Sequence, residues 1–330
     1  MFVKYVYCIH NTKVVADGGR NRPGNRYGVW KIIKCLSERK MNMDEIRLKA
    51  LAKINLGLDV VGQQENGYHL VRMVMQTIHL FDSVQIQKTR TPGIQLTSNM
   101  KFLPRDEHNI AYKAADLLMQ EFKITEGIHI NITKRIPVCA GMAGGSTDAA
   151  AVLYGMNQMF GLKLSYRQMA KRGLTLGADV PYCLMRGTAL AEGIGEKLTR
   201  LPAMPRCLVV VAKPAVSVST KWVYENLNLD KHMVHPDIDR LLTGIEQQNL
   251  KKMAMHMGNI LEEVTAKEYP VITQIKENLT SHGAIRAMMS GSGPTVFALF
   301  EKRGEAQKAA DALRISGLVR QIYVTTIFNV

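Results

Sequence analysis

The sequence predicts an α+β protein built from two sandwich-like domains. Runs that alternate between apolar and polar residues, the pattern of strands, occur between stretches with helical spacing, and none of them forms a βαβ dinucleotide-binding unit. A length of 330 residues also favours two domains. A Pro- and Met-rich bridge at 201–206 lies between two strand-like runs. We therefore expect one domain over 44–204 and a second over 205–330.

The first 43 residues form a basic leader that differs from the rest. Residues 1–40 contain nine Lys or Arg and two acidic residues, and they show neither helical nor strand periodicity. The leader has no apolar core followed by a small-residue cleavage site, which argues against a secretory signal, although a basic, acid-poor leader also resembles an organelle transit peptide. We expect residues 1–43 to be disordered or non-native, and a chain that starts at Met43 to be active.

In the first half of the body, alternation predicts strands over 46–62, 84–88 and 129–136, with an Asn-Gly turn at 66–67. Helices are predicted over 109–122 and 147–160, and Ser165 with Gln168 forms a capping box for a helix ending near 176. Two further strands are predicted, over 186–192 and 207–213. In the second half we expect helices over 219–227, 236–258, 270–281 and 304–316, and strands over 284–289, 295–300 and 319–328.

A loop of small residues at 137–150 carries the most chemical information. Small side chains let backbone N–H groups approach a ligand closely, and a helix that starts near Ser146 directs its positive end to the same place. This arrangement suits a polyphosphate, yet it has neither the Gly-Lys-Ser/Thr ending of a Walker loop nor the dinucleotide spacing. Because Ala avoids positive φ, we expect ordinary backbone angles at the non-glycine positions and left-handed ones only at glycines. The former are Cys139, Ala140 and Ala143, and the latter Gly141, Gly144 and Gly145.

Three further features support this loop. Lys53 and Asn55 lie on the same face of an otherwise apolar strand, where a solvated face is the simple alternative. Asp179 stands between small residues and Pro181, where a turn or capping role is the alternative. A Gly- and Ser-rich turn at 290–295 could be only a tight hairpin. Together these parts offer two phosphate cradles, a cation and a base, which are what phosphoryl transfer requires.

Charge and cysteine content exclude several other classes. The net charge is +15, of which residues 1–40 hold +7, so the body is only moderately basic and no nucleic-acid partner is required. The five cysteines form no paired motif, which argues against disulfides and a zinc site and suits the cytoplasm. The nine histidines, His232 and His235 among them, have no metal-site spacing, and we expect this pair to be solvated. No apolar run is long enough to cross a membrane, and we expect Cys139 to be a small buried residue.

With these motifs in order along the chain, the sequence resembles the GHMP superfamily of small-molecule kinases. The resemblance covers about 45–328, and it rests on Ala52–Leu58, Pro137–Ala150 and Ser290–Thr295, with Asn66–His69 and Leu174–Pro181 marking a subfamily. It implies a ribosomal-protein-like amino-terminal domain and a ferredoxin-like α/β-sandwich carboxy-terminal domain. It also implies transfer of the γ-phosphoryl group of ATP to the 2-hydroxyl of 4-diphosphocytidyl-2-C-methyl-D-erythritol in non-mevalonate isoprenoid biosynthesis.

The resemblance assigns roles to matching residues. Asp179 resembles the general base, and Lys53 the cation that keeps it ionised. Asn55, Tyr68 and His69 match positions that bind the cytidine end, and a third-motif loop is formed by Ser290, Gly291, Ser292 and Gly293. The ATP phosphates and Mg²⁺ are expected at the small-residue loop, with Ser146 or Thr147 near the metal. The ATP-binding set is Pro137, Val138, Cys139, Ala140, Gly141, Met142, Ala143, Gly144, Gly145, Ser146 and Thr147.

Two alternatives remain open from the sequence. The chain could be another GHMP kinase, of the mevalonate or homoserine type, although the Asn-Gly-Tyr-His and Gly-Ala-Asp-Val-Pro segments favour the cytidyl substrate. A basic RNA-binding module is the alternative from another class, and the absence of interleaved aromatic and basic residues argues against it. We expect a small-molecule cytidyl diphosphate substrate, no nucleic acid, no membrane, and a monomer or a weak homodimer.

Overall fold

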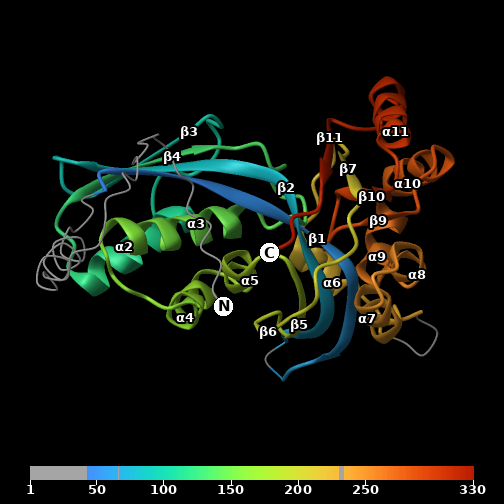
Figure 1. The fold of residues 1–330 in the computed structure, drawn as a ribbon, viewed down its shortest axis with the longest axis horizontal. Helices are drawn as coiled ribbons and strands as arrows, with labels where there is room; N and C mark the ends of the chain where they lie inside the picture. The colour runs from blue at the N-terminus through green and yellow to red at the C-terminus, as the bar shows by residue number, and fades with distance from the viewer. Residues whose placement is uncertain (1–42, 66, 230–233) are drawn as a thin grey trace, which may run out of the picture. The chain divides into compact units, whose positions relative to one another are not determined.

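The computed structural model describes residues 43–65, 67–229 and 234–330 (Figure 1). Residues 43–330 form one compact unit. The predicted leader lies outside the described residues except for Met43, as do Asn66 of the predicted turn and His232. The described part contains two sheets with helices packed on them, as expected for an α+β chain.

The first sheet has seven strands around one long antiparallel hairpin. The hairpin consists of β1 (Glu45–Gln63) and β2 (His69–Thr89). One half of β2 pairs with β4 (Gly127–Thr133) and the other with β5 (Thr188–Gly193), so the sheet divides along its length. The remaining strands are β3 (Ile94–Ser98), β6 (Lys197–Arg200) and the short β8 (Gly258–Asn259). The predicted strand 84–88 is therefore only the end of β2.

The register of the hairpin shifts at two points that flank the candidate lysine. The pairing register of β1 with β2 shifts between Leu51 and Lys53 and again between Asn55 and Gly57. An irregularity of this kind bends a strand and redirects its side chains, and such bulges are common beside active sites. The alternation that places Lys53 and Asn55 on one face is kept between the two shifts.

Four helices cover one face of the first sheet (Figure 1). They are α2 (Ile110–Phe122), α3 (Gly144–Met159), α4 (Tyr166–Leu176) and the short α5 (Val180–Met185). Gly155 lets α3 approach the hairpin, because a Cβ there would lie 2.6 Å from a methyl carbon of Ile86. The predicted capping box of Ser165 and Gln168 is confirmed at the start of α4. Helix α3 begins at Gly144, three residues before the predicted range of 147–160 and two before Ser146.

The second sheet is antiparallel, in the order β11-β7-β10-β9. Its strands are β7 (Leu208–Lys213), β9 (Arg286–Met289), β10 (Val296–Phe300) and β11 (Gln321–Thr326). The helices α10 (Val271–Ser281) and α11 (Arg303–Ser316) pack against this sheet, and α6 (Thr220–Glu225), α7 (Ile238–Glu246), α8 (Leu250–Met255) and α9 (Leu261–Glu268) complete this half.

The single helix predicted over 236–258 is wrong, because this segment forms two helices and a strand. Helix α7 ends at Glu246, and Gln248 follows with φ 53°, which no helix continues through. Asn249 then caps α8 by accepting a hydrogen bond from the backbone N–H of Lys252. After α8 ends at Met255, two residues lead to β8, which pairs with β1 of the first sheet. The chain passes from the first sheet to the second between β6 and β7, near the predicted domain boundary at 204/205, which stays a prediction.

Within the described ranges, no helix is both long enough and apolar enough to span a membrane.

Candidate active site

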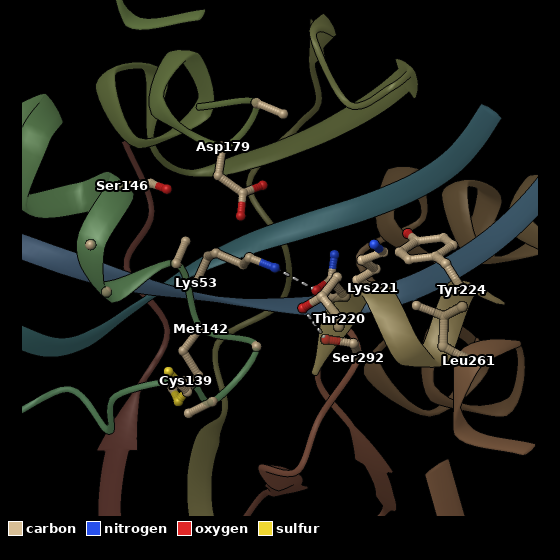
Figure 2. Close-up of a pocket in the computed structure, with 18 of the residues that line it drawn as sticks. Lys53, Cys139, Met142, Ser146, Asp179, Thr220, Lys221, Tyr224, Leu261 and Ser292 are labelled. Carbon is tan, nitrogen blue, oxygen red and sulfur yellow. Dashed lines mark hydrogen bonds between the residues drawn. The ribbon is translucent and has the colours of Figure 1, made fainter. Parts of the chain in front are cut away.

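A cavity of about 1310 Å³ brings most of the predicted site residues together (Figure 2). Its walls come from β1, the small-residue loop before α3, the segment before α5, helix α6 and the loop between β9 and β10. This volume exceeds the roughly 300–1,000 Å³ of a typical single-ligand pocket, so the cavity has room for two sizeable substrates. Of the predicted residues, Thr147, Ser290 and Gly293 are not among those that line it.

Lys53 and Asn55 are held together in the wall formed by β1. The Nζ of Lys53 donates a hydrogen bond to Oδ1 of Asn55 at 2.7 Å, and the amide of Asn55 donates to the sulfur of Met73 at 3.3 Å. Lys53 is 5% exposed and Asn55 is fully buried. The solvated-face alternative is therefore wrong for this strand, and the ammonium is fixed in direction at the cavity.

Asp179 faces this lysine from the opposite wall. It occupies the N-cap position of α5, between the end of α4 and Pro181, and its side chain makes no capping hydrogen bond. A capping role is thus not observed. Figure 2 shows its carboxylate pointing into the cavity toward the side chain of Lys53, with the hydroxyl of Ser146 beside it.

The small-residue loop has a backbone that differs from the expected one. Positive φ occurs at Cys139 (51°), Gly141 (69°) and Ala143 (56°), whereas Gly144 and Gly145 have no positive φ. The prediction of ordinary angles at Cys139 and Ala143 is therefore wrong, as is the prediction of left-handed angles at Gly144 and Gly145. Both glycines belong to α3, where the backbone is helical.

The alternation of left-handed residues at every second position has a chemical consequence. Backbone that switches between right- and left-handed conformations turns its N–H groups to one side, and such a concave nest binds anions. Helix α3 follows directly and adds its positive end. The spacing of left-handed residues and the start of α3 both suit this loop to an anion.

Contacts from two other segments hold the loop in place. The carbonyl of Met142 accepts from the N–H of Lys53 at 3.2 Å, and the carbonyl of Gly141 accepts from the hydroxyl of Ser290 at 3.0 Å. A Cβ at Gly141 would lie 2.0 Å from the carbonyl oxygen of Ser290. Only glycine fits at this crossing, where the two Gly-rich loops meet.

Two side chains of the loop region differ from expectation. Cys139 is exposed and lines the cavity, so the expectation that it is buried is wrong. Ser146 lines the cavity, whereas Thr147 is 2% exposed and lies outside the lining. Of the two hydroxyls expected near a metal ion, only that of Ser146 reaches the cavity wall.

The turn at 290–295 is more than a hairpin. Ser290 and Thr295 are fully buried, and the amide of Asn259 donates to the carbonyls of Met289 and Gly291 at 2.9 and 2.8 Å. The hydroxyl of Ser292 is 2.8 Å from that of Thr220 on α6. The turn is thus anchored to β8 and α6 and forms the floor between Lys53 and the α6 side of the cavity (Figure 2).

Aromatic groups form the far end of the cavity. The ring of His69 lies 4.9 Å from that of Tyr224 on α6, with 32° between their planes, and the exposed Tyr68 precedes it. Burial raises the pKa of Tyr224 to about 12, with a smaller contribution from the charge of Asp179. Sequence reasoning missed Tyr224, because nothing in a short helix distinguishes a cavity aromatic from a packing one.

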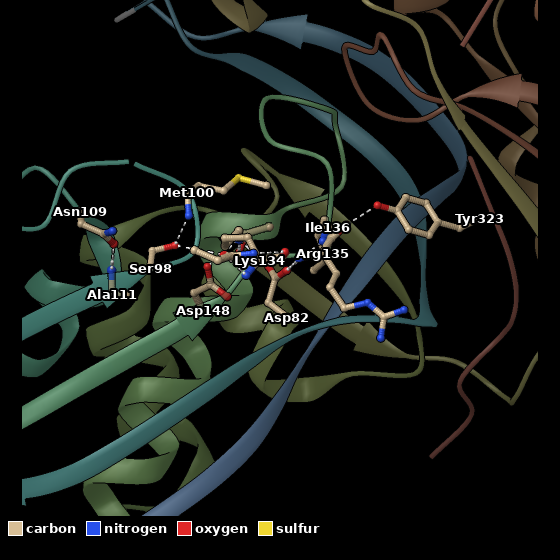
Figure 3. Close-up of polar contacts among 12 residues, drawn as sticks. Asp82, Ser98, Met100, Asn109, Ala111, Lys134, Arg135, Ile136, Asp148 and Tyr323 are labelled. Carbon is tan, nitrogen blue, oxygen red and sulfur yellow. Dashed lines mark hydrogen bonds and ion pairs between the residues drawn. The ribbon is translucent and has the colours of Figure 1, made fainter. Parts of the chain in front are cut away.

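A buried ionic cluster beneath the small-residue loop was also missed (Figure 3). Lys134 forms ion pairs with Asp82 and with Asp148, the latter at 2.6 Å, and all three residues are buried. Burial raises the pKa of Asp148 to about 7, the charge of Asp82 adds to this, and Lys134 opposes it. Burial would lower the pKa of Lys134, but the two carboxylates outweigh it and raise the pKa.

His235, expected to be solvated, instead contacts Asp59 on β1 at 2.7 Å. The imidazole is about half exposed (47%) and the carboxylate is largely covered (11%). The contact joins the segment before α7 to the first sheet.

Family models match both halves of the chain. The description "GHMP kinases N terminal domain" matches residues 109–187, and "GHMP kinases C terminal" matches residues 241–317. A 4-diphosphocytidyl-2-C-methyl-D-erythritol kinase of Lachnoclostridium phytofermentans is 53% identical over 287 residues, which cover 87% of this chain and 99% of that protein. The chain belongs to the GHMP kinase family. It is therefore a kinase, which transfers a phosphoryl group from ATP to an alcohol.

Other relatives place the chain within this family. Enzymes of the same name from Lachnospira eligens and Clostridium perfringens are 53% and 46% identical, covering 87% and 86% of this GHMP kinase and 100% and 99% of their own lengths. A crystal structure of a 4-(cytidine 5'-diphospho)-2C-methyl-D-erythritol kinase shares 29% identity with a TM-score of 0.75 over 86% of this chain and all of the other. A homoserine kinase from Cytophaga hutchinsonii, 21% identical with a TM-score of 0.67 and covering 86% of this chain and 95% of its own, shows the shared fold. The predicted two-domain fold class is confirmed.

Proposed function

We propose that this GHMP kinase transfers the γ-phosphoryl group of ATP to the 2-hydroxyl of 4-diphosphocytidyl-2-C-methyl-D-erythritol. One observation carries the proposal: a single cavity has an anion-binding loop at one end, aromatic rings at the other, and Lys53 and Asp179 between them. The names of the relatives, at up to 53% identity, support the choice of acceptor.

The nucleotide end is assigned to the loop before α3. Backbone N–H groups from Val138 to Thr147 hold the ATP phosphates, with the nest at Cys139, Gly141 and Ala143 and the helix start supplying positive potential. These interactions need no side-chain charge, which accounts for the lack of a Walker lysine.

The reacting groups lie between the two ends. Asp179 accepts the proton of the 2-hydroxyl, whose oxygen forms the new bond to the γ-phosphorus as the bond to the β-γ bridging oxygen breaks and ADP leaves. Lys53 offsets the negative charge shared between the carboxylate and the incoming oxygen. Because Oδ1 of Asn55 accepts from Lys53, Asn55 orients the ammonium, and its contact with the cytidine end of the substrate stays a prediction.

Mg²⁺ fits the donors at the phosphate end. Magnesium prefers hard oxygen ligands and is usually bound through substrate phosphates with one or two protein groups. The hydroxyl of Ser146 is such a donor at the cavity wall, and buried Thr147 is not. When bound, the ion neutralises charge on the ATP phosphates. Ser146 orients that end of the nucleotide, and the alanines and glycines beside it keep the wall close.

The cytidine end is assigned to the rings. A flat base stacks between Tyr68 and the Tyr224 face, while His69, turned by its contact with Tyr224, reads an edge of the base by hydrogen bonding. Of the turn at 290–293, Gly291 and Ser292 line the cavity, and their small size leaves room there for the diphosphate of the acceptor.

All of these groups come from one chain, so a monomer or a weak homodimer suffices. We place the enzyme in the cytoplasm, acting on a small molecule and not on nucleic acid. Gel filtration with light scattering tests the oligomeric state, and an obligate tetramer would contradict it.

An ADP-release assay with three acceptors tests the function. The cytidyl substrate should be turned over, with kcat/KM at least about a hundredfold above mevalonate and homoserine, since a site built for hydrogen bonds rejects analogues that lack them. Turnover of mevalonate or homoserine alone would contradict the proposal and favour the alternative kinase classes.

A further inference from the structure

The buried cluster of Asp82, Lys134 and Asp148 has no assigned role in the proposed reaction, yet it lies directly under the phosphate loop (Figure 3). Its three side chains come from β2, the residue after β4 and the fifth residue of α3. A buried ion cluster of this kind is weak evidence for stability, because desolvation offsets most of the attraction. Its placement therefore suggests a positional role.

Lys134 is fully committed to protein groups. An ammonium has three N–H donors. Here they go to Oδ2 of Asp82, to Oδ2 of Asp148 at 2.6 Å and to the carbonyl of Gly144 at 3.2 Å. Lys134 lines the cavity, but it cannot donate to an ATP phosphate without losing one of these contacts, so all three of its N–H donors serve the protein here.

The same cluster holds the other end of the loop. Oδ1 of Asp82 accepts hydrogen bonds from the backbone N–H groups of Arg135 and Ile136, the latter at 2.8 Å. These two residues precede the non-helical part of the loop, residues 137–143, while Gly144 and Asp148 follow that part in α3. One carboxylate and one ammonium thus join the entrance and the exit of residues 137–143 to strand β2.

The loop between these points needs such an anchor. Cys139 and Ala143 adopt left-handed φ, which residues with a Cβ rarely do on their own. A conformation that the local sequence disfavours persists where the surrounding structure imposes it. With both ends fixed, the seven residues between Ile136 and Gly144 have little freedom to relax.

We infer that Asp82, Lys134 and Asp148 are positioning residues that hold the phosphate loop in its nucleotide-binding conformation and so set the affinity for ATP. The inference rests on the proposed role of residues 137–147 in binding the ATP phosphates. It predicts that loss of the cluster weakens nucleotide binding more than an equal loss of stability elsewhere would.

The chain offers a matched pair of variants in α3. Asp148→Ala removes one acceptor of Lys134 near the start of the helix, and Asn157→Ala removes the side chain that bonds the N–H and C=O of Leu164 near the other end. Both delete a buried polar group from the same helix. Asp148→Asn keeps an oxygen for Lys134 and serves as the conservative rescue.

The measurement is calorimetric affinity for ATP without the acceptor, together with the thermal midpoint of each variant. Asp148→Ala should bind ATP about ten- to a hundredfold more weakly, as expected for a displaced binding group. Asp148→Asn and Asn157→Ala should stay within about threefold of the native affinity, and the latter should lose thermal stability. If Asp148→Ala does not fold, Lys134→Gln takes its place with the same expectation.

A loop variant separates this inference from the function on which it rests. Gly141→Ala places a Cβ 2.0 Å from the Ser290 carbonyl and should abolish tight ATP binding. If Gly141→Ala loses ATP binding while Asp148→Ala binds ATP as tightly as the native enzyme does, the positioning role is wrong. If Gly141→Ala itself binds ATP normally, the loop is not the phosphate site and the proposed function fails. If Asp148→Ala and Asn157→Ala weaken ATP binding equally, the effect follows from lost stability alone, and this would also overturn the inference.

Discussion

The ammonium of Lys53 donates to the side-chain oxygen of Asn55 two residues along β1, at 2.7 Å. Asp179 points toward this pair from the start of α5, across the cavity (Figure 2). The amide therefore fixes a buried cation in front of the proposed base, although Asp179 lies more than 100 positions from Lys53 and Asn55 in the sequence.

Replacing the base should remove turnover and spare binding. We expect Asp179→Asn to lower kcat by about 10²–10⁴, the usual range for a lost general base, with little change in the KM for ATP. Steady-state kinetics check this, and turnover near the native rate would exclude Asp179 from the proton transfer.

Removing the oxygen that orients the lysine should act on the same step. Asn55→Leu takes away the acceptor at 2.7 Å, so the ammonium loses its fixed direction. We expect kcat to fall by about tenfold to a hundredfold, as for a misplaced catalytic group, and ATP affinity to stay the same. Lys53→Met should lower kcat at least as much as Asn55→Leu does. A larger fall in kcat for Asn55→Leu than for Lys53→Met would contradict the assigned roles.

The aromatic end should control the acceptor and not the nucleotide. Tyr224→Ala removes the ring that lies 4.9 Å from His69. The loss of one base-stacking ring, about 1–3 kcal/mol, should raise the KM for the cytidyl substrate by roughly five- to a hundredfold. The KM for ATP is the internal control. A larger change in the KM for ATP than in the KM for the cytidyl substrate would mean that ATP, and not the acceptor, binds at the aromatic end.

Replacing Ala143, which has a left-handed φ, by glycine should stabilise the protein. Ala143 has φ 56°, at a cost of roughly 1–2 kcal/mol for a residue with a Cβ, whereas Ala140 has no positive φ. Ala143→Gly should thus be more stable toward urea than Ala140→Gly by about 1–2 kcal/mol. Equal stabilities of the two variants would show that the loop carries no such strain.

The described cysteines should differ sharply in reactivity. Burial raises the pKa of Cys207 to about 12 and also raises the pKa of Cys183, so both stay protonated at pH 8 and lack the nucleophilic thiolate. Cys139 is exposed at the cavity. Alkylation followed by peptide mass spectrometry should modify Cys139 before these two, and ATP should protect it. Modification of Cys207 first, in folded protein, would contradict the structure.

Motifs that are contiguous in the chain could be predicted, because the residues that determine their chemistry are neighbours in the sequence. The small-residue loop, the Lys53–Asn55 pair and the Ser165 capping box all belong to this class. The cluster of Asp82, Lys134 and Asp148 could not be found in this way. Each member is a single charged residue in an ordinary element, and only the fold brings them together from 14 and 52 positions away.

Backbone angles in the loop were predicted wrongly for a related reason. The rule that alanine avoids positive φ describes a residue on its own. At Ala143 the anchors at Ile136, Gly144 and Asp148 decide the conformation, and they lie outside the local pattern. The break at Gln248 between α7 and α8 is a second case, since apolar residues at helical spacing occur on both sides of it and masked the short polar gap.

The position of the new phosphate on the acceptor tests the account most directly. After incubation with ATP and 4-diphosphocytidyl-2-C-methyl-D-erythritol, ³¹P NMR should show a phosphomonoester without three-bond coupling to a proton, because the carbon at position 2 carries a methyl group and no hydrogen. Asp179→Asn should give almost none of it. A monoester split by a neighbouring C–H, or release of inorganic phosphate alone, would contradict the proposed transfer to the 2-hydroxyl.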